Sequence, residues 1–382
     1  MRISWNHGSV ITISSFILVV IVLVWGVVSI DPDFEMVDYF AIMGIVMVAI
    51  TVASAFIKHN MLRRVVFVAA VCVPVVLIVS LEMLGKYGDV KSLRFNIERV
   101  DDRLLRYQYV PGAKANGTGE RWNNSLGLND REYSTVKPPD VYRIAVLGDS
   151  VPNDGSMLNE ETFHERLETM FNDQRFIEHK TGTEYRKVEV LNVSCEGYNT
   201  LQEVRLFEKV YDSFKPDLVI IAYVLNDPFI QDGSYRRFGN SFFMFKVTMF
   251  VEYMIFDIYQ KPLADLFFGF HGRYSFDLIV KSSFERLKLL SELHGFDVMV
   301  GIIPLILSFE DHPFGDIYQQ VADLAESQGF GAVQMFDRFK DVPIESVSKG
   351  GDFTHPLPAG HAIMANILND YILEHYLKVQ GN

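Results

Sequence analysis

The stretch Val141-Tyr-Arg-Ile-Ala-Val-Leu-Gly-Asp-Ser150 decides the fold class of this chain. It is a mostly apolar, β-branched run that stops abruptly at Gly148-Asp149-Ser150. Such a run is typical of a strand buried on both faces, as in a parallel sheet covered by helices. The glycine then turns the chain and leaves the Ser150 hydroxyl at the carboxyl end of the strand, where open α/β sheets bind their ligands. Because this tripeptide also forms ordinary turns and helix caps, its role depends on the rest of the chain.

Strand-like and helix-like segments alternate after Ser150. Apolar runs predict further strands over residues 188–193, 218–224, 298–307 and 332–336. Helical periodicity predicts helices over residues 160–173, 201–214, 276–294, 317–328 and 359–377. Alternation at this spacing predicts a doubly wound parallel sheet with right-handed crossovers, an α/β domain over residues 141–382.

One segment, residues 228–276, interrupts the alternation with a dense set of aromatic side chains. It leaves from the carboxyl end of the third expected strand. One interpretation is a lid or a membrane-facing platform beside the site. The other is a helical hairpin that buries its aromatic rings in the core.

Polar residues follow several of the expected strands. Ser150 follows the first strand, Cys195-Glu-Gly197 follows the second, and Asn226-Asp227 follows the third. Asp352-Phe-Thr-His355 lies in the loop before the last helix. Because parallel strands end at the same edge of a sheet, these loops are expected to meet although they are far apart in sequence.

These residue types suit nucleophilic catalysis. The spacing of Asp352 and His355 lets the carboxylate hold Nδ1 of the ring, so that Nε2 can act as a base. Ser150 needs such a partner because a hydroxyl is otherwise a poor nucleophile. Gly197 can bring a backbone N–H to a developing oxyanion, and the Asn226 amide can donate a second hydrogen bond.

On these residues the chain resembles the SGNH (GDSL-type) hydrolase superfamily, as a membrane-anchored bacterial member. The four motifs just quoted match the four family blocks in order, and the likeness covers about residues 141–378. It implies a three-layer α/β/α fold. It also implies catalytic roles for Ser150 as nucleophile, His355 as base and Asp352 as orienting acid.

The resemblance further implies an oxyanion hole made of the Ser150 N–H, the Gly197 N–H and the Asn226 side chain. Two departures affect this part of the pattern. Val224 stands where the third block usually has glycine, and the residues that follow Ser150, 151–155, differ from the usual apolar run.

Other polar residues near these motifs are expected to be structural. Asp149 and Asp227 are expected to accept backbone hydrogen bonds in turns, and His361 to pack or cap at the start of the last helix. Cys195 is expected to be a small buried residue, since nothing pairs it with a base. No metal-ligand spacing is present, so neither a metal nor a cofactor is expected.

The first 85 residues contain three long apolar segments, 10–30, 39–57 and 65–84. Each has about the length that a helix needs to cross a bilayer, and together they predict a membrane anchor of three transmembrane helices. The first loop carries only acidic charges and the second only basic ones. Because basic residues collect in cytoplasmic loops, the amino terminus is expected inside and the catalytic domain outside the cytoplasm, in a multi-pass membrane protein.

Between the anchor and the first strand, residues 86–140 are polar, contain glycine and asparagine, and end in Lys137-Pro-Pro-Asp140. They predict a membrane-proximal connector with short irregular pieces that pack on the domain. The net charge of −13 argues against a nucleic-acid partner, because phosphate binding needs clustered Lys and Arg.

Taken together, these features predict a membrane-anchored, extracytoplasmic serine esterase. It is expected to remove an O-acyl group, with acetyl as the expected acyl, from an envelope saccharide or glycolipid through an acyl-serine intermediate. Three alternatives stay open: an O-acyltransferase on a cell-envelope polysaccharide, a lysophospholipase or thioesterase, and a non-catalytic saccharide-binding module. The expected partners are an acylated saccharide or lipid substrate, the membrane, and a membrane protein that takes part in envelope polymer modification.

Overall fold

The computed structural model describes residues 97–114, 123–153, 157–173, 177–229, 271–272, 275–307, 309–310, 312–348 and 352–379. The three segments expected to cross a membrane lie outside these residues, as does most of the aromatic insert 228–276. Among the described helices, none has both the length and the apolar character that a membrane span requires.

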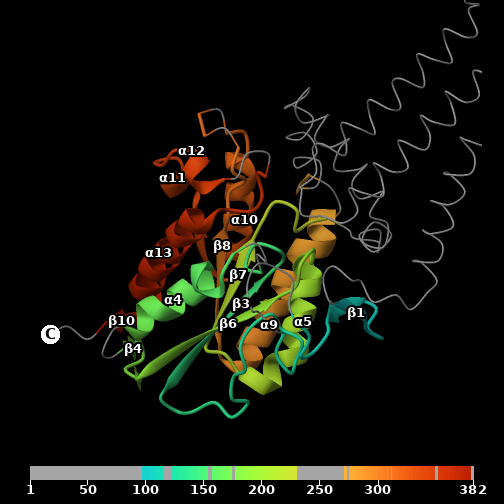
Figure 1. Ribbon diagram of the computed structural model, residues 1–382, viewed down its shortest axis with the longest axis vertical. Coiled ribbons are helices and arrows are strands. Elements are labelled where there is room, and N and C mark those ends of the chain that lie inside the picture. Colours follow the sequence, from blue (N-terminus) through green and yellow to red (C-terminus); the bar gives the residue numbers. More distant parts are fainter. Residues whose placement is uncertain are drawn as a thin grey trace, which may run out of the picture. The chain divides into compact units, whose positions relative to one another are not determined.

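A five-stranded sheet with the order β6-β3-β7-β8-β9 forms the centre of the domain (Figure 1). Its strands, all paired in parallel, are β3 (Val141–Gly148), β6 (Lys187–Ser194), β7 (Leu218–Tyr223), β8 (Asp297–Ile302) and β9 (Gly331–Gln334). The chain runs from β3 to β6 on one side and then returns past β3 to β7 on the other. This reversal places the switch point of a doubly wound sheet at the carboxyl end of β3, next to Ser150.

Helices cover both faces of the sheet, which gives three layers (Figure 1). One layer contains α4 (Phe163–Asn172) and α13 (Pro358–His375), which pack against each other. The other contains α5 (Thr200–Phe214), α9 (Ser282–His294) and α10 (Gly315–Ser327). The short helices η1 (Asn159–Glu161), η2 (Phe276–Lys281), α11 (Phe336–Phe339) and α12 (Ile344–Val347) complete the described helical part.

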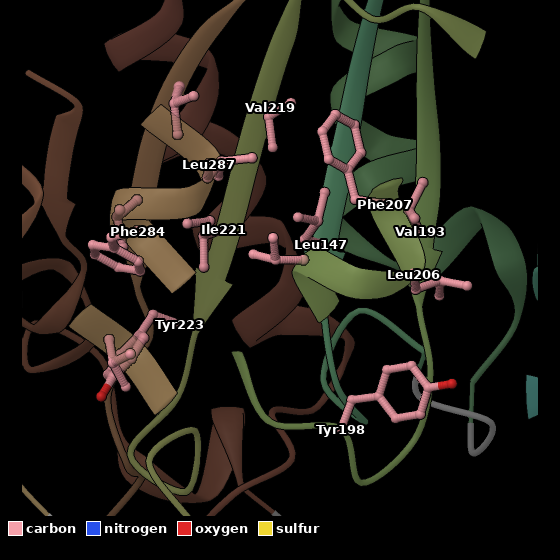
Figure 2. Packing of buried hydrophobic residues seen from close by; sticks show 14 of the residues in the cluster. Leu147, Val193, Tyr198, Leu206, Phe207, Val219, Ile221, Tyr223, Phe284 and Leu287 are labelled. Carbon is pink, nitrogen blue, oxygen red and sulfur yellow. The ribbon is translucent and has the colours of Figure 1, made fainter. Parts of the chain in front are cut away.

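The side chains of β3 alternate between the two layers, as the period of a strand requires. Ala145 and Leu147 join the core on the α5 side, whereas Ile144 and Val146 join the core on the α4 side. Figure 2 shows the α5-side core, in which Leu147 and its neighbours on β6 and β7 lie close to side chains of α5 and α9. The eight residues of β3 are buried throughout, so the strand is a rigid base for the turn that carries Ser150.

Two expected strands end earlier than the apolar runs suggested. β8 stops at Ile302, because Pro304 has no N–H to donate to a neighbouring strand. β9 stops at Gln334, and Phe336 begins α11 instead. The described residues also contain a small antiparallel sheet that the sequence did not predict, made of β4 (Ile177–His179), β5 (Glu184–Tyr185) and β10 (Leu377–Val379).

The described part of the connector packs on the domain. Strands β1 (Ile97–Arg99) and β2 (Tyr107–Tyr109) form an antiparallel pair. Tyr107 and Tyr109 are buried in the α5-side core. Asp130 accepts the N–H of Asn192 at 2.7 Å, so the connector also covers the outer edge of β6.

Candidate active site

The turn after β3 presents Ser150. Gly148 is required here, because a Cβ at this position would lie 2.6 Å from Pro152 Cγ. Asp149 Oδ1 accepts the N–H of Val151 at 3.1 Å and closes the turn. Ser150 itself is half-buried, while its neighbours on both sides are buried. The serine is therefore the residue of this turn that a substrate can reach.

Three side chains from two distant parts of the sequence come together at this turn. His355 Nε2 lies 2.9 Å from Ser150 Oγ. On the other side of the ring, His355 Nδ1 lies 2.9 Å from Asp352 Oδ2. A carboxylate on Nδ1 keeps a proton on that nitrogen, which leaves Nε2 able to accept the serine proton. The arrangement has the geometry of a Ser–His–Asp triad.

The loop that carries Asp352 and His355 is held by its own backbone bonds. Asp352 Oδ1 accepts the N–H groups of Thr354 and His355, each at 3.0 Å. The N–H of Ile306, just beyond β8, donates to Phe353 O at 2.7 Å and ties the loop to the sheet edge. Burial raises the pKa of Asp352, but the hydrogen bonds and charge of His355 outweigh it and leave the pKa below its usual 3.8. Asp352 is therefore ionised at neutral pH.

The loops after β6 and β7 carry Gly197 and Asn226, which the sequence predicts as oxyanion donors. Gly197 has a φ of 75°, a left-handed conformation that favours glycine. Its loop is tied to the end of β3 by the N–H of Cys195, which donates to Gly148 O at 3.2 Å. Asn226 Nδ2 donates to Asp149 Oδ2 at 2.8 Å. Since an amide nitrogen carries two hydrogens, this bond orients the group and leaves one hydrogen for a substrate oxygen.

Three buried carboxyl groups lie beneath these loops, on Asp149, Asp227 and Glu203. Burial is the largest cause that raises the pKa of each, and the charges of the neighbouring carboxyls add to it for Glu203 and Asp227. Both carboxyl oxygens of Glu203 are buried without a hydrogen-bond partner. Within the part of the chain that the structure describes, no cation offsets this residue, so its protonated form is the favoured one.

Replacement of Glu203 by glutamine is expected to raise the melting temperature more at pH 8 than at pH 5. The pKa of Glu203 is higher in the folded than in the unfolded chain. The folded state therefore holds the Glu203 proton more tightly than the unfolded state does. The contribution of this group to stability is fully present below the unfolded pKa and is lost as the pH rises toward the folded pKa. Glutamine does not titrate, so the variant does not lose this stability. The loss amounts to on the order of 1 kcal/mol for each unit by which the folded and unfolded pKa values differ.

Thermal unfolding of the two proteins at pH 5 and pH 8 measures the effect. Glu292→Gln, the same change at an exposed residue of α9, serves as the matched control. An equal shift for Glu203→Gln at the two pH values would show that Glu203 carries its charge in the folded protein.

The remaining residues near the motifs, His361, Cys195 and Val224, have structural roles. His361 is buried, stacks on Phe163 and accepts the Phe163 N–H at 3.1 Å, so it caps the start of α4. Cys195 is buried, and burial raises the pKa of its thiol. Val224 is buried and takes part in a turn in which its carbonyl accepts the Asp227 N–H at 3.1 Å.

Two features of the site were not predicted from the sequence. The bond from Asn226 to Asp149 was not expected, because Asp149 was expected to accept backbone hydrogen bonds alone. The buried carboxyl of Glu203 was not expected either. A signal for it exists, since Glu203 lies four residues before Phe207 on the apolar face of α5, where a charged residue is unusual.

No family model matches the chain, and no curated protein matches it. A solved structure of a lipase/acylhydrolase from Enterococcus faecalis is 12% identical over 63% of this chain and 100% of that chain, with a TM-score of 0.39. TesA is 14% identical over 60% and 98%, with a TM-score of 0.39. Axe2, an acetylxylan esterase from Geobacillus stearothermophilus, is 16% identical over 60% and 94%, with a TM-score of 0.37.

Proposed function

We propose that this chain is a serine esterase of the SGNH (GDSL-type) class. The observation that carries the proposal is the contact of 2.9 Å between Ser150 Oγ and His355 Nε2, with Asp352 2.9 Å from the opposite ring nitrogen. Acyl transfer to serine requires a nucleophile, a base and an orienting acid that are hydrogen-bonded in this order.

In the proposed reaction, His355 Nε2 takes the hydroxyl proton while Ser150 Oγ bonds to the acyl carbon of the ester. The carbonyl electrons move to the oxygen, which accepts hydrogen bonds from the Ser150 and Gly197 N–H groups and from Asn226. The tetrahedral intermediate then expels the alcohol, which takes the proton from His355, and leaves an acyl-serine. Water repeats the sequence: it gives a proton to His355, bonds to the acyl carbon and releases the acid, and Ser150 Oγ regains its proton.

The proposed substrate is an O-acyl group, expected to be acetyl, on a saccharide or glycolipid of the cell envelope. The support comes from the three apolar segments before residue 86 and from the charges of the loops between them, which favour a site on the outer side of a membrane. Such a location gives the enzyme access to envelope polymers and to the membrane proteins that modify them.

The test combines labelling with product analysis. A fluorophosphonate probe is expected to attach to Ser150 of the full chain in detergent micelles. Acetylated oligosaccharides are expected to release acetate, whereas lysophospholipids are not. Transfer of acetyl to an added sugar without release of acetate would favour the acyltransferase, and release of fatty acid from lysophospholipids would favour the lysophospholipase. Absence of both labelling and turnover would contradict the esterase and leave a binding module.

The location is a separate prediction. Alkaline phosphatase fused after Asn382 is expected to be active, because this enzyme matures only outside the cytoplasm. A cytoplasmic reporter such as β-galactosidase, fused at the same position, serves as the matched control and is expected to be inactive. The reverse pair of results would place the catalytic domain inside the cell.

A further inference from the structure

The connector reaches the active-site edge through two tyrosines of β2. Tyr107 and Tyr109 are two residues apart, so their side chains leave the same face of the strand. Both are buried, with 6% and 5% of their surface exposed. They come within hydrogen-bond distance of one residue of the loop after β6, Glu196.

These two hydroxyls hold both backbone polar groups of Glu196. The Tyr107 hydroxyl donates to Glu196 O at 3.0 Å. The Tyr109 hydroxyl accepts the Glu196 N–H at 3.1 Å and is also bonded by Asn153 Nδ2, from the loop after Ser150. Burial raises the pKa of Tyr109 well above 10, so its hydroxyl remains neutral.

The carbonyl of Glu196 belongs to the same peptide unit as the N–H of Gly197. A trans peptide is planar, and its C=O and N–H point in opposite directions. A bond that fixes the direction of the Glu196 carbonyl therefore also fixes the direction of the Gly197 N–H. This restraint is important at a glycine, because glycine tolerates many backbone conformations and its preceding peptide can rotate at little cost.

We propose that Tyr107 is a positioning residue of the active site, which orients the Gly197 N–H for the oxyanion through its hydrogen bond to Glu196 O. The proposal rests on the proposed esterase function, because an oxyanion forms only in that chemistry. Tyr198 in turn holds Tyr107 in place: the Tyr198 hydroxyl donates to Tyr107 O, and the two rings pack edge to face with their centroids 5.1 Å apart. The connector thus contributes a positioning residue to the active site in addition to linking it to the preceding segments.

The test is Tyr107→Phe, which removes one oxygen and keeps the ring. The control is Tyr133→Phe: Tyr133 lies in the same connector, and its hydroxyl also donates to a backbone carbonyl, Val190 O at 3.1 Å, but that carbonyl lies inside β6. With p-nitrophenyl acetate and the full chain in detergent micelles, Tyr107→Phe is expected to lower kcat about tenfold or more, with KM within about twofold. The ceiling is the loss of one whole oxyanion donor, about 10²–10³ in kcat.

A second readout separates positioning from general damage. A boronic acid that forms a tetrahedral adduct with Ser150 is expected to bind Tyr107→Phe more weakly by a factor similar to the loss in kcat, while Tyr133→Phe keeps wild-type affinity. Rates are expressed per active site, counted by complete reaction with a fluorophosphonate, so that misfolded molecules do not contribute. If Tyr107→Phe does not fold, Tyr109→Phe removes the acceptor of the Glu196 N–H, in the peptide unit just before the one that carries the Gly197 N–H, and is expected to lower kcat as well.

The outcomes distinguish the two proposals. An active wild type with equal kcat for the Tyr107 and Tyr133 variants, or a change in KM alone, would overturn the role of Tyr107 and leave the esterase in place. A wild type that neither hydrolyses the ester nor reacts with the fluorophosphonate would overturn both.

Discussion

Alanine at Ser150 or at His355 is expected to remove nearly all ester hydrolysis, and the double variant is expected to lose little more than either single one. The contact of 2.9 Å between the two side chains is the reason, because the hydroxyl needs the imidazole to take its proton, and without the serine no acyl-enzyme forms on which the imidazole could act. In serine hydrolases such residues act as a unit, and the loss of either costs on the order of 10⁶ in kcat.

Asp352→Ala is expected to keep a larger remnant of activity than either of these variants. An imidazole without its carboxylate still presents the correct nitrogen part of the time. In wild type, hydrolysis is expected to rise with pH through the neutral region, because the base has to be neutral.

Initial rates with p-nitrophenyl acetate, together with circular dichroism to confirm folding, measure these effects. Ser346→Ala and His375→Ala change the same residue types at exposed positions of α12 and α13 and serve as matched controls. Wild-type hydrolysis by a folded Ser150→Ala variant would show that another group is the nucleophile.

Asn226→Ala is expected to lower kcat by about 10²–10³ with little change in KM, because the amide meets the oxygen only when the negative charge develops. The structure adds a reason for this strength. The bond of 2.8 Å to Asp149 fixes the amide before substrate arrives, so that little reorientation is needed during the reaction.

The same substitution leaves the Asp149 carboxyl without its amide partner. A drop in melting temperature is therefore expected beside the drop in kcat, and rates are compared per labelled active site. A raised KM with unchanged kcat would show that Asn226 binds the ground state of the substrate instead.

Much of this fold could be predicted from local pattern. The apolar runs of β3, β6 and β7 and the helical periodicity of α5 and α13 were located within a few residues, because burial on both faces of a strand or on one face of a helix is recorded in neighbouring positions. The candidate triad could be named from local motifs: Ser150 from its place after β3, and Asp352 and His355 from their spacing and from the family resemblance. Parallel strands end at one edge, which explains why the loops after β3, β6 and β7 lie together.

The remaining features depend on contacts between residues far apart in the chain. The small antiparallel sheet pairs Leu377 with His179, and the local sequence of neither segment predicts that it pairs with the other. Glu203 stands on an apolar helix face, but only the packing of α5 on the sheet places its carboxyl beside Asp149 and Asp227.

The orientation of the Gly197 peptide is the clearest case. The glycine and its motif were recognised in the sequence, because the residue type and the spacing are local properties. The carbonyl of the preceding residue, Glu196, accepts a hydrogen bond from the Tyr107 hydroxyl, 89 residues away in a connector that carried no catalytic motif, and we propose that this bond sets the direction of the Gly197 N–H. A hydrogen bond requires both a short donor–acceptor distance and a favourable angle. The hydroxyl and the carbonyl reach this geometry only after the connector has packed against the folded domain.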